Sequence, residues 1–224
     1  MSPAGPESDR IDLRRHAARR ADTLLVMLAG AYDPPARFLE HGLPEACAAA
    51  GLTADLTLLR TDLSAVADGR IVHELHARVI EPARRDGYGH LILGGISIGA
   101  MMALLHQDVF PDSADELLAI ATYPGNRALT ATIARAGGIR AWRPEALAAD
   151  EGELRAWRSA KRLGEHPSVP LWFGFGAQDR FATSQQMMAA TLPPQRVSAL
   201  PGAHDWPTWA AVWRWWLAAR SGAP

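Results

Sequence analysis

The stretch Leu91–Leu105 constrains the fold of this chain more than any other part of the sequence. It reads Leu-Ile-Leu-Gly-Gly-Ile-Ser-Ile-Gly-Ala-Met-Met-Ala-Leu-Leu. The apolar run before the glycines is typical of a buried strand, and the apolar residues at three-and-four spacing after them are typical of a helix. Gly95 and Gly99 flank Ser97 and leave room for a sharp turn between strand and helix. The pattern predicts a turn that presents Ser97 as a nucleophile, with the N–H of Ile98 facing a developing oxyanion.

A glycine-flanked serine alone also fits a plain strand-to-helix turn, so the assignment of a nucleophile needs further residues. A serine hydroxyl is a weak nucleophile and requires a base within hydrogen-bond reach, which in turn requires an orienting acid. The rest of the chain must supply both groups.

Composition limits the classes of protein to which the chain can belong. Its 224 residues suffice for one well-buried domain, with 48% hydrophobic and 21% charged residues and a net charge of −1. This balance gives no electrostatic attraction to nucleic acid or anionic lipid, and no apolar run reaches transmembrane length. The single cysteine, Cys47, lies in an alanine-rich stretch, where we expect a helix-packing thiol. We expect neither a nucleic-acid nor a membrane partner, and the sequence leaves a homodimer open.

The first residues are polar and rich in arginine, and we interpret residues 1–22 as a loose arm that ends in a short helix. The arginines, followed by Leu24–Leu28 and small residues, imitate a secretory signal. Cleavage there would remove a strand that the fold needs, so we expect a cytoplasmic protein. Residues 23–224 then form a single domain.

Strands and helices alternate along this domain. Apolar runs predict strands, and periodic segments between them predict helices. The expected strands are Thr23–Leu28, Ala54–Leu59, the run that begins at Leu91, Leu117–Tyr123, Val169–Gly176 and Arg196–Leu200. This alternation indicates an α/β fold with a mostly parallel sheet of about six strands, in the order 2-1-3-4-5-6, with helices on both faces. Ligands bind such sheets beyond the carboxyl ends of the strands.

One stretch breaks the alternation. Residues 124–167 contain two or three short helical segments but no strand of core quality, and they are too long for a plain crossover. We interpret them as a short helical cap. The final helix, from about Trp206 to Ala219, places Trp209, Val212, Trp213, Trp216 and Leu217 on one face, which predicts that most of the tryptophan cluster belongs to the core.

The loops that follow two of the expected strands contain a candidate base and a candidate acid. Of eight histidines, His204 follows the last strand in a tight loop, which predicts that it lies over the carboxyl edge of the sheet. Asp179 is the first carboxylate after the fifth strand and is the expected acid. Its competitor Asp205 adjoins His204 and is better explained as a helix N-cap. His73 and His76 lie three residues apart, without the four-residue spacing of a zinc-protease helix.

Ser97, Asp179 and His204, in this chain order and after a strand-end loop at residues 29–32, make the chain resemble the α/β-hydrolase superfamily, in particular small serine esterases. The resemblance covers residues 23–219. It implies an oxyanion hole formed by the amides of Ile98 and Ala31, and a catalytic triad that needs no cofactor or metal. The loop lacks the family's His-Gly sequence, and the short N-terminal segment implies that the family's first two strands are missing.

From this resemblance we expect hydrolysis of a carboxylic ester of a small-to-medium acyl substrate, with Tyr32, Trp142, Trp157 and Trp206 as candidate pocket residues. A thioesterase or an acyltransferase would use the same triad. A non-catalytic binding protein of the same fold is the alternative from a different class.

Overall fold

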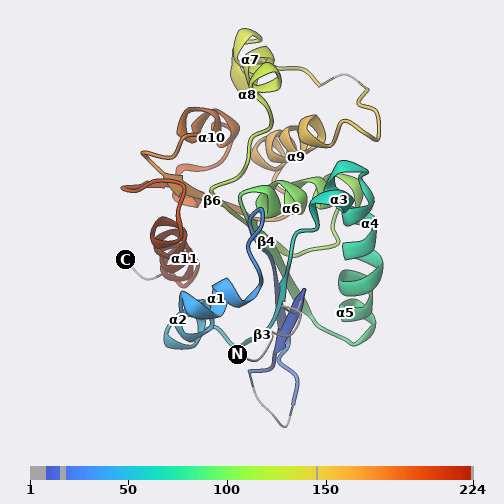
Figure 1. Ribbon diagram of the computed structural model, residues 1–224, viewed down its shortest axis with the longest axis vertical. Helices are drawn as coiled ribbons and strands as arrows, with labels where there is room; N and C mark the ends of the chain where they lie inside the picture. The colour runs from blue at the N-terminus through green and yellow to red at the C-terminus, as the bar shows by residue number, and fades with distance from the viewer. Residues whose placement is uncertain (1–8, 16–18, 145, 223–224) are drawn as a thin grey trace, which may run out of the picture.

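A sheet of seven strands, in the order β1-β3-β2-β4-β5-β6-β7, forms the centre of the molecule (Figure 1). The computed structural model describes residues 9–15, 19–144 and 146–222. Within them the strands are β1 (Arg10–Leu13), β2 (Thr23–Leu28), β3 (Ala54–Leu59), β4 (His90–Ile96), β5 (Glu116–Ile120), β6 (Leu171–Gly176) and β7 (Val197–Leu200). Strands β2 to β7 pair in parallel, whereas β1 pairs with β3 in the antiparallel direction.

The α/β fold and the order of the six parallel strands are confirmed, but the sheet has one strand more than expected. Strand β1 lies in the segment that we had interpreted as a loose arm. The hydroxyl of Thr57 on β3 donates to Asp12 at 2.7 Å, and the backbone N–H of Arg15 donates to Asp55 at 2.8 Å. Ile11 and the end of the strand pack against the core, so tertiary contacts hold this polar segment in the sheet.

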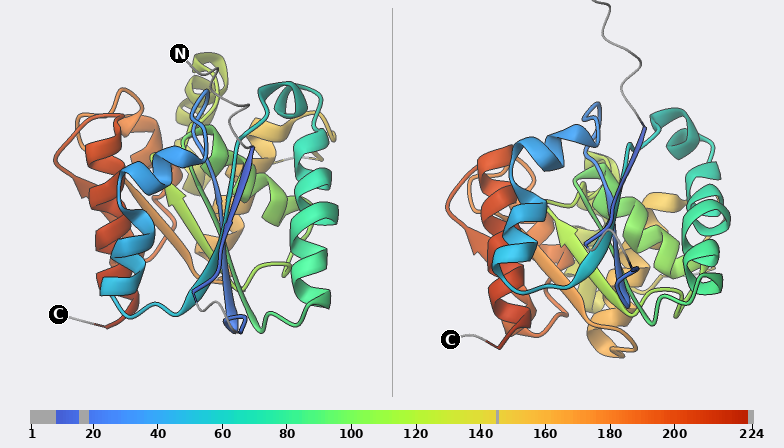
Figure 2. Two further views of the ribbon diagram at one scale, coloured as in Figure 1. Left: turned by 60° about the horizontal axis from the view of Figure 1, so that its bottom comes forward. Right: turned by 90° about the horizontal axis from the view of Figure 1, so that it is seen from below.

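Helices cover both faces of the sheet (Figure 2). One face carries α1 (Ala36–Glu40), α2 (Leu43–Ala49) and α11 (Trp206–Arg220). The other carries α3 (Leu63–Ala67), α4 (Arg70–Leu75), α5 (Glu81–Arg85), α6 (Ile98–Val109) and α9 (Gly152–Glu165), with a π-helical turn at His76–Ile80 between α4 and α5. The remaining helices are α7 (Arg127–Arg135), α8 (Gly138–Ala141), α10 (Ala182–Met188) and a 3₁₀ turn at Pro194–Arg196. Two separate apolar clusters, one beneath each layer of helices, form the core.

Helix α11 supplies much of one of these clusters. The residues that we expected on its buried face, Trp209, Val212, Trp213, Trp216 and Leu217, are all buried there. The indole N–H of Trp216 donates to Glu116 on β5 at 2.8 Å, so the helix is also anchored to the sheet by a buried polar contact. The assignment of these tryptophans to the core is confirmed.

The stretch expected to form a cap, residues 124–167, contains α7, α8 and α9. Helix α9 packs against α6, and its Trp157 is fully buried in the core, so α9 covers the sheet as a crossover helix does. Helices α7 and α8 project beyond it at one end of the molecule (Figure 1). Within the described residues, none of the helices has the length and hydropathy needed to cross a membrane.

Candidate active site

Ser97 occupies the turn between β4 and α6 in a backbone conformation that few residues other than glycine adopt. Its φ is 55° and its ψ is −115°. Two backbone hydrogen bonds hold the turn: Ser97 N–H donates to the carbonyl of Ile120 at 2.9 Å, and Tyr123 N–H donates to the carbonyl of Ser97 at 3.0 Å. The neighbouring strand β5 therefore fixes the serine at the carboxyl edge of the sheet.

The glycines around Ser97 are required by close approach of the backbone. A Cβ at Gly99 would lie 2.6 Å from the carbonyl oxygen of Ala29, and a Cβ at Gly95 would lie 2.6 Å from the amide nitrogen of Ala100. Real Cβ atoms do not approach other atoms this closely, so only glycine fits either position. The sequence pattern and the observed turn thus have the same steric cause.

Three side chains that are far apart in the sequence form a continuous hydrogen-bond chain at this edge. His204 Nε2 lies 3.0 Å from Ser97 Oγ, and His204 Nδ1 lies 2.6 Å from Asp179 Oδ2. With Nδ1 protonated and donating to Asp179, Nε2 is free to accept the hydroxyl proton of Ser97. The structure therefore brings together the three residues that the sequence reasoning placed at strand ends, in the geometry that activates a serine.

Asp179 remains ionised because several donors surround it. Burial alone would raise the pKa of this carboxyl group, but hydrogen bonds from His204, from the backbone N–H of Phe181 and from Gln185 outweigh burial and hold the pKa below its usual value. The Phe181 and Gln185 donors lie at 2.8 and 3.2 Å. The Gln185 amide also donates to the carbonyl of Thr122 at 3.1 Å, which links α10 to the end of β5. An ionised Asp179 can therefore orient the His204 ring.

Two aromatic rings pack against His204. Phe181 meets it edge-on with ring centroids 5.4 Å apart, and Trp209 does so at 5.2 Å. These contacts restrict rotation of the imidazole and support the orientation set by Asp179. Sequence reasoning identified neither Phe181 nor Gln185, and it assigned Trp209 to the core only. The only sequence feature that could have indicated a role for Phe181 and Gln185 is their position, two and six residues after Asp179.

Asp205 has the role expected of it. Its carboxylate accepts hydrogen bonds from the backbone N–H of Thr208 at 3.1 Å and from the Thr208 hydroxyl at 2.6 Å, which caps the N-terminus of α11. The assignment of Asp205 as a helix cap is confirmed. This cap also fixes the start of α11 directly after His204.

The two amides expected to form the oxyanion hole lie on elements that approach Ser97. Ile98 is the first residue of α6, where N–H groups have no intrahelical partner. Ala31 lies in the exposed loop after β2, which is tied to the end of β3 by a hydrogen bond of 2.6 Å from the Thr61 hydroxyl to the carbonyl of Ala29. The participation of Ile98 and Ala31 in an oxyanion hole stays a prediction.

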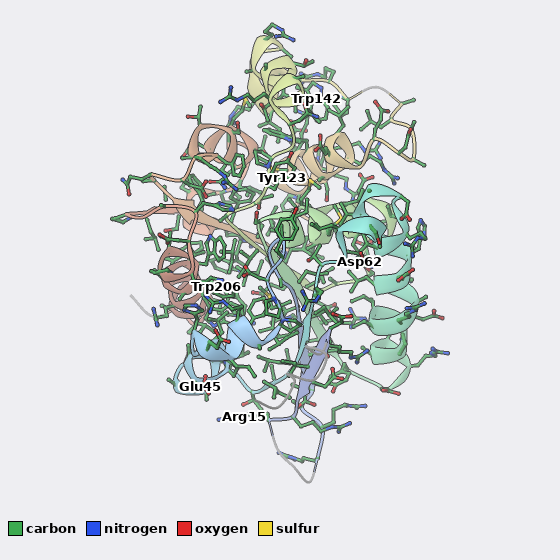
Figure 3. All side chains as sticks on the ribbon, viewed as in Figure 1. Arg15, Glu45, Asp62, Tyr123, Trp142 and Trp206 are labelled. Atoms are coloured by element: carbon green, nitrogen blue, oxygen red, sulfur yellow. The ribbon has the colours of Figure 1, made fainter. Side chains whose placement is uncertain are left out.

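The four aromatic residues expected to line a pocket are dispersed. Trp157 is fully buried, and its indole N–H donates to the carbonyl of Pro124 at 2.7 Å, so it is a core residue. Trp206 is buried and stacks on His41. Trp142 is buried beside α8, far from Trp206 (Figure 3). Tyr32 is 85% exposed. These four side chains do not surround a common cavity.

The other histidines that the structure describes are not grouped into a metal site. Among the described residues, no group of three or more His, Cys, Asp or Glu side chains is arranged to hold a metal ion. His76 Nδ1 lies 3.3 Å from His106 Nε2, and the ring of His76 stacks on Phe110. These histidines therefore contribute to the packing of the π-helical turn against α6.

The comparisons with known proteins agree with this geometry at the level of fold. No protein-family model matches the chain, and no curated protein matches its sequence. Among solved structures, the chain is similar to the fluorophosphonate-binding serine hydrolase FphF of Staphylococcus aureus, with 12% identity, a TM-score of 0.65 and coverage of 93% of this chain and 90% of that one. It is also similar to the S-formylglutathione hydrolase FrmB of the same organism, with 13% identity, a TM-score of 0.62 and coverage of 89% and 81%.

A third similar structure is the thioesterase domain from the curacin biosynthetic pathway, with 13% identity, a TM-score of 0.54 and coverage of 87% and 90%. These identities are low, so the similarity is evidence of shared architecture. The parallel sheet, the strained serine turn and these similarities together show that the chain has the α/β-hydrolase fold.

Proposed function

We propose that this protein is a serine hydrolase that cleaves a carboxylic ester through an acyl-enzyme intermediate. The observation that carries the proposal is the unbroken hydrogen-bond chain from Asp179 through His204 to Ser97. Structural packing alone does not require a buried carboxylate, an imidazole and a hydroxyl in this order at the edge of a sheet where ligands bind. The resemblance to esterases and serine hydrolases points to the same chemistry.

The proposed reaction begins when Ser97 Oγ attacks the ester carbonyl and His204 Nε2 takes the hydroxyl proton. The N–H groups of Ile98 and Ala31 stabilise the oxyanion. His204 then gives its proton to the leaving alcohol, and the acyl group remains on Ser97. A water molecule, deprotonated by His204, then attacks the acyl-enzyme. The bond between Ser97 Oγ and the acyl carbon breaks, His204 returns the proton to Ser97 Oγ, and the acid is released. Asp179 stabilises the charged imidazole in both halves of the reaction.

Hydrolysis of a thioester is the second candidate, because the chain resembles a thioesterase domain and the same triad would perform it. Acyl transfer differs only in the acceptor that deacylates Ser97. A binding protein without activity would have no need of the hydrogen bond between Ser97 Oγ and His204 Nε2. We therefore rank ester hydrolysis first and treat the others as outcomes of one experiment.

The experiment is labelling with a fluorophosphonate probe, followed by kinetics on matched p-nitrophenyl esters and acyl thioesters. Wild-type protein should be labelled once, at Ser97. Ser97→Ala should remove labelling and lower turnover by several orders of magnitude, roughly to the residual level from binding and oxyanion contacts. Ser221→Ala, at the exposed end of α11, is the matched control and should retain both properties.

Near-native turnover by Ser97→Ala would refute the nucleophile assignment. Higher kcat/KM on thioesters than on the matched esters would move the assignment to a thioesterase. A wild-type protein that neither reacts with the probe nor turns over any substrate would favour the binding protein.

A further inference from the structure

A cavity of about 590 Å³ lies between helix α6, the segment that joins α3 to α4, and the start of α9. This volume is within the range of about 300–1,000 Å³ that is usual for small-molecule sites. Its walls include one row of residues on α6: Ile98, Met101, Met102, Leu105 and Val109. The cavity was not foreseen from the sequence, because its opposite wall comes from segments distant in the chain.

One lining residue of the cavity lies next to Ser97 in the chain, although Ser97 itself does not line the cavity. Ile98, which lines it, directly follows Ser97. The lining residues of α6 recur at three- and four-residue spacing and therefore lie on one face of the helix. From Ile98 to Val109 the helix advances roughly 16 Å, at about 1.5 Å per residue. The cavity thus extends along α6 from the residue next to Ser97, and this shape suits an extended chain.

The position of His204 decides which half of an ester would lie in this cavity. His204 must protonate the leaving alcohol, so the alcohol lies on the side of Ser97 that faces Nε2. Of the groups around His204, Asp179 and Phe181 lie in the loop between β6 and α10, and Trp209 lies on α11. None of these residues lines the cavity. The cavity is therefore separate from the groups around His204, which leaves it available to the acyl side of the ester.

The α6 wall favours an apolar occupant, whereas the rim also carries the acidic side chains Asp150 and Glu153. Met101 and Met102 offer flexible thioether side chains that adapt to an alkyl chain. The basic side chains at the rim are already paired: Arg70 with Asp68 at 2.7 Å, and Arg155 with Asp108 at 2.9 Å. A charged substrate group would have to compete with these ion pairs.

We infer that this cavity binds the acyl chain of the substrate, so that the protein prefers unbranched, medium-length acyl esters, with Leu105 and Val66 determining the chain length. The inference rests on the proposed serine hydrolase function. Leu105 lies midway along the α6 row, close to Gly152 at the start of α9, where an added Cβ would be 3.1 Å from Leu105 Cδ2. Val66, half-buried on α3, lies on the opposite wall.

The test compares p-nitrophenyl acetate, butyrate, octanoate and laurate as substrates. Leu105→Trp places an indole across the middle of the cavity and should lower the ratio of kcat/KM for octanoate to that for acetate at least about tenfold, since one methylene group in a pocket is worth about 10–200-fold. Val66→Trp should lower the ratio in the same direction from a half-buried position on a different helix. Leu39→Trp, on α1 and 37% exposed, is the matched control and should leave the ratio at its wild-type value.

Thermal unfolding of each variant establishes that it is folded, and Val66→Trp carries the test if Leu105→Trp is not. An unchanged octanoate-to-acetate ratio in the folded tryptophan variants would overturn the acyl site while Ser97-dependent turnover still supports the hydrolase. An equal loss on all four esters would mean that the substitutions act only on structure, and would also overturn it. Absence of any turnover or probe labelling in wild-type protein would overturn the hydrolase itself and this inference with it.

Discussion

At the scale of single residues, position in the fold separates two acids that are similar in the sequence. Asp179 and Asp205 both lie in loops near His204, yet one contacts the imidazole and the other caps a helix. The difference arises because Asp179 lies just beyond the carboxyl end of β6, where its carboxylate meets His204 Nδ1. Substituting asparagine for aspartate at each position tests this distinction.

Asp179→Asn should lower turnover about 10³–10⁴-fold, because the amide carries no charge and favours the wrong imidazole tautomer; the same change in the serine-protease triad costs about 10⁴-fold. Asp205→Asn should retain turnover and lose well under about 1 kcal/mol of stability, because Asn caps helices as well as Asp does. Steady-state kinetics and urea unfolding measure both quantities. The acid assignment fails if Asp205→Asn is the inactive variant.

At the scale of elements, the β4–α6 turn depends on close contact between backbones. Gly99→Ala should lower the free energy of unfolding by roughly 3 kcal/mol or more, because its Cβ would overlap the carbonyl groups that end β2. Gly69→Ala provides the comparison: its φ is 74°, but no atom lies within 4 Å of the added Cβ. It should therefore cost only the left-handed backbone strain, about 1–2 kcal/mol. Chemical denaturation that gives equal losses would remove close packing as the reason for the glycine.

The sequence predicted those elements that their own residues specify. It did not predict elements that form only because of contacts with distant parts of the chain. The parallel strands are continuous apolar runs, and the serine turn is encoded by its own glycines. Strand β1, by contrast, has the polar sequence Arg-Ile-Asp-Leu and is held by contacts with β3, such as the hydrogen bond from Thr57 to Asp12. Trp157 shows the same limit, because only the packing of α9 on α6 decides that it is buried.

At the scale of the whole molecule, one buried histidine makes the fold sensitive to acid. His106 is fully buried between α6 and the π-helical turn, and burial, together with the nearby His76 and His73, lowers its pKa to about 3. An unfolded chain binds a proton at a histidine of pKa about 6.5. Between these values the unfolded state binds the proton and the folded state does not, so stability falls as the pH falls.

Wild-type protein should therefore lose roughly 2 kcal/mol between pH 6.5 and 5 from this residue, at about 1.4 kcal/mol per pH unit. His106→Gln should lose correspondingly less over that interval, whatever its stability at pH 7.5. Urea unfolding at each pH measures the loss, with the exposed His166→Gln as a control that keeps the wild-type dependence. If the free energy of unfolding depends on pH in the same way for wild type and His106→Gln, His106 is not the source of the acid sensitivity.

The only cysteine of the chain reports on global unfolding. Cys47 is buried in α2, and burial raises the pKa of its thiol to about 12. The thiolate is the reactive form, so iodoacetamide should modify the native protein very slowly and the urea-unfolded protein rapidly. Mass spectrometry of intact protein follows the reaction. Rapid modification without denaturant would show that α2 opens independently of the rest of the fold.

The short outer strands of the sheet have a consequence for aggregation. Strands β1 and β7, four residues each, occupy the two edges, whereas the longer β3 lies one place inward with Leu56 and Leu58 buried. Exposed edges act as templates for pairing with other chains, and short, charged edge strands oppose this. Strand β1, with Arg10 and Asp12, therefore covers the edge of β3. Without β1, the six residues of β3 would be open to pairing with another molecule. The polar sequence that makes β1 hard to identify as a strand therefore places charged side chains at the edge of the sheet, where they oppose pairing between molecules.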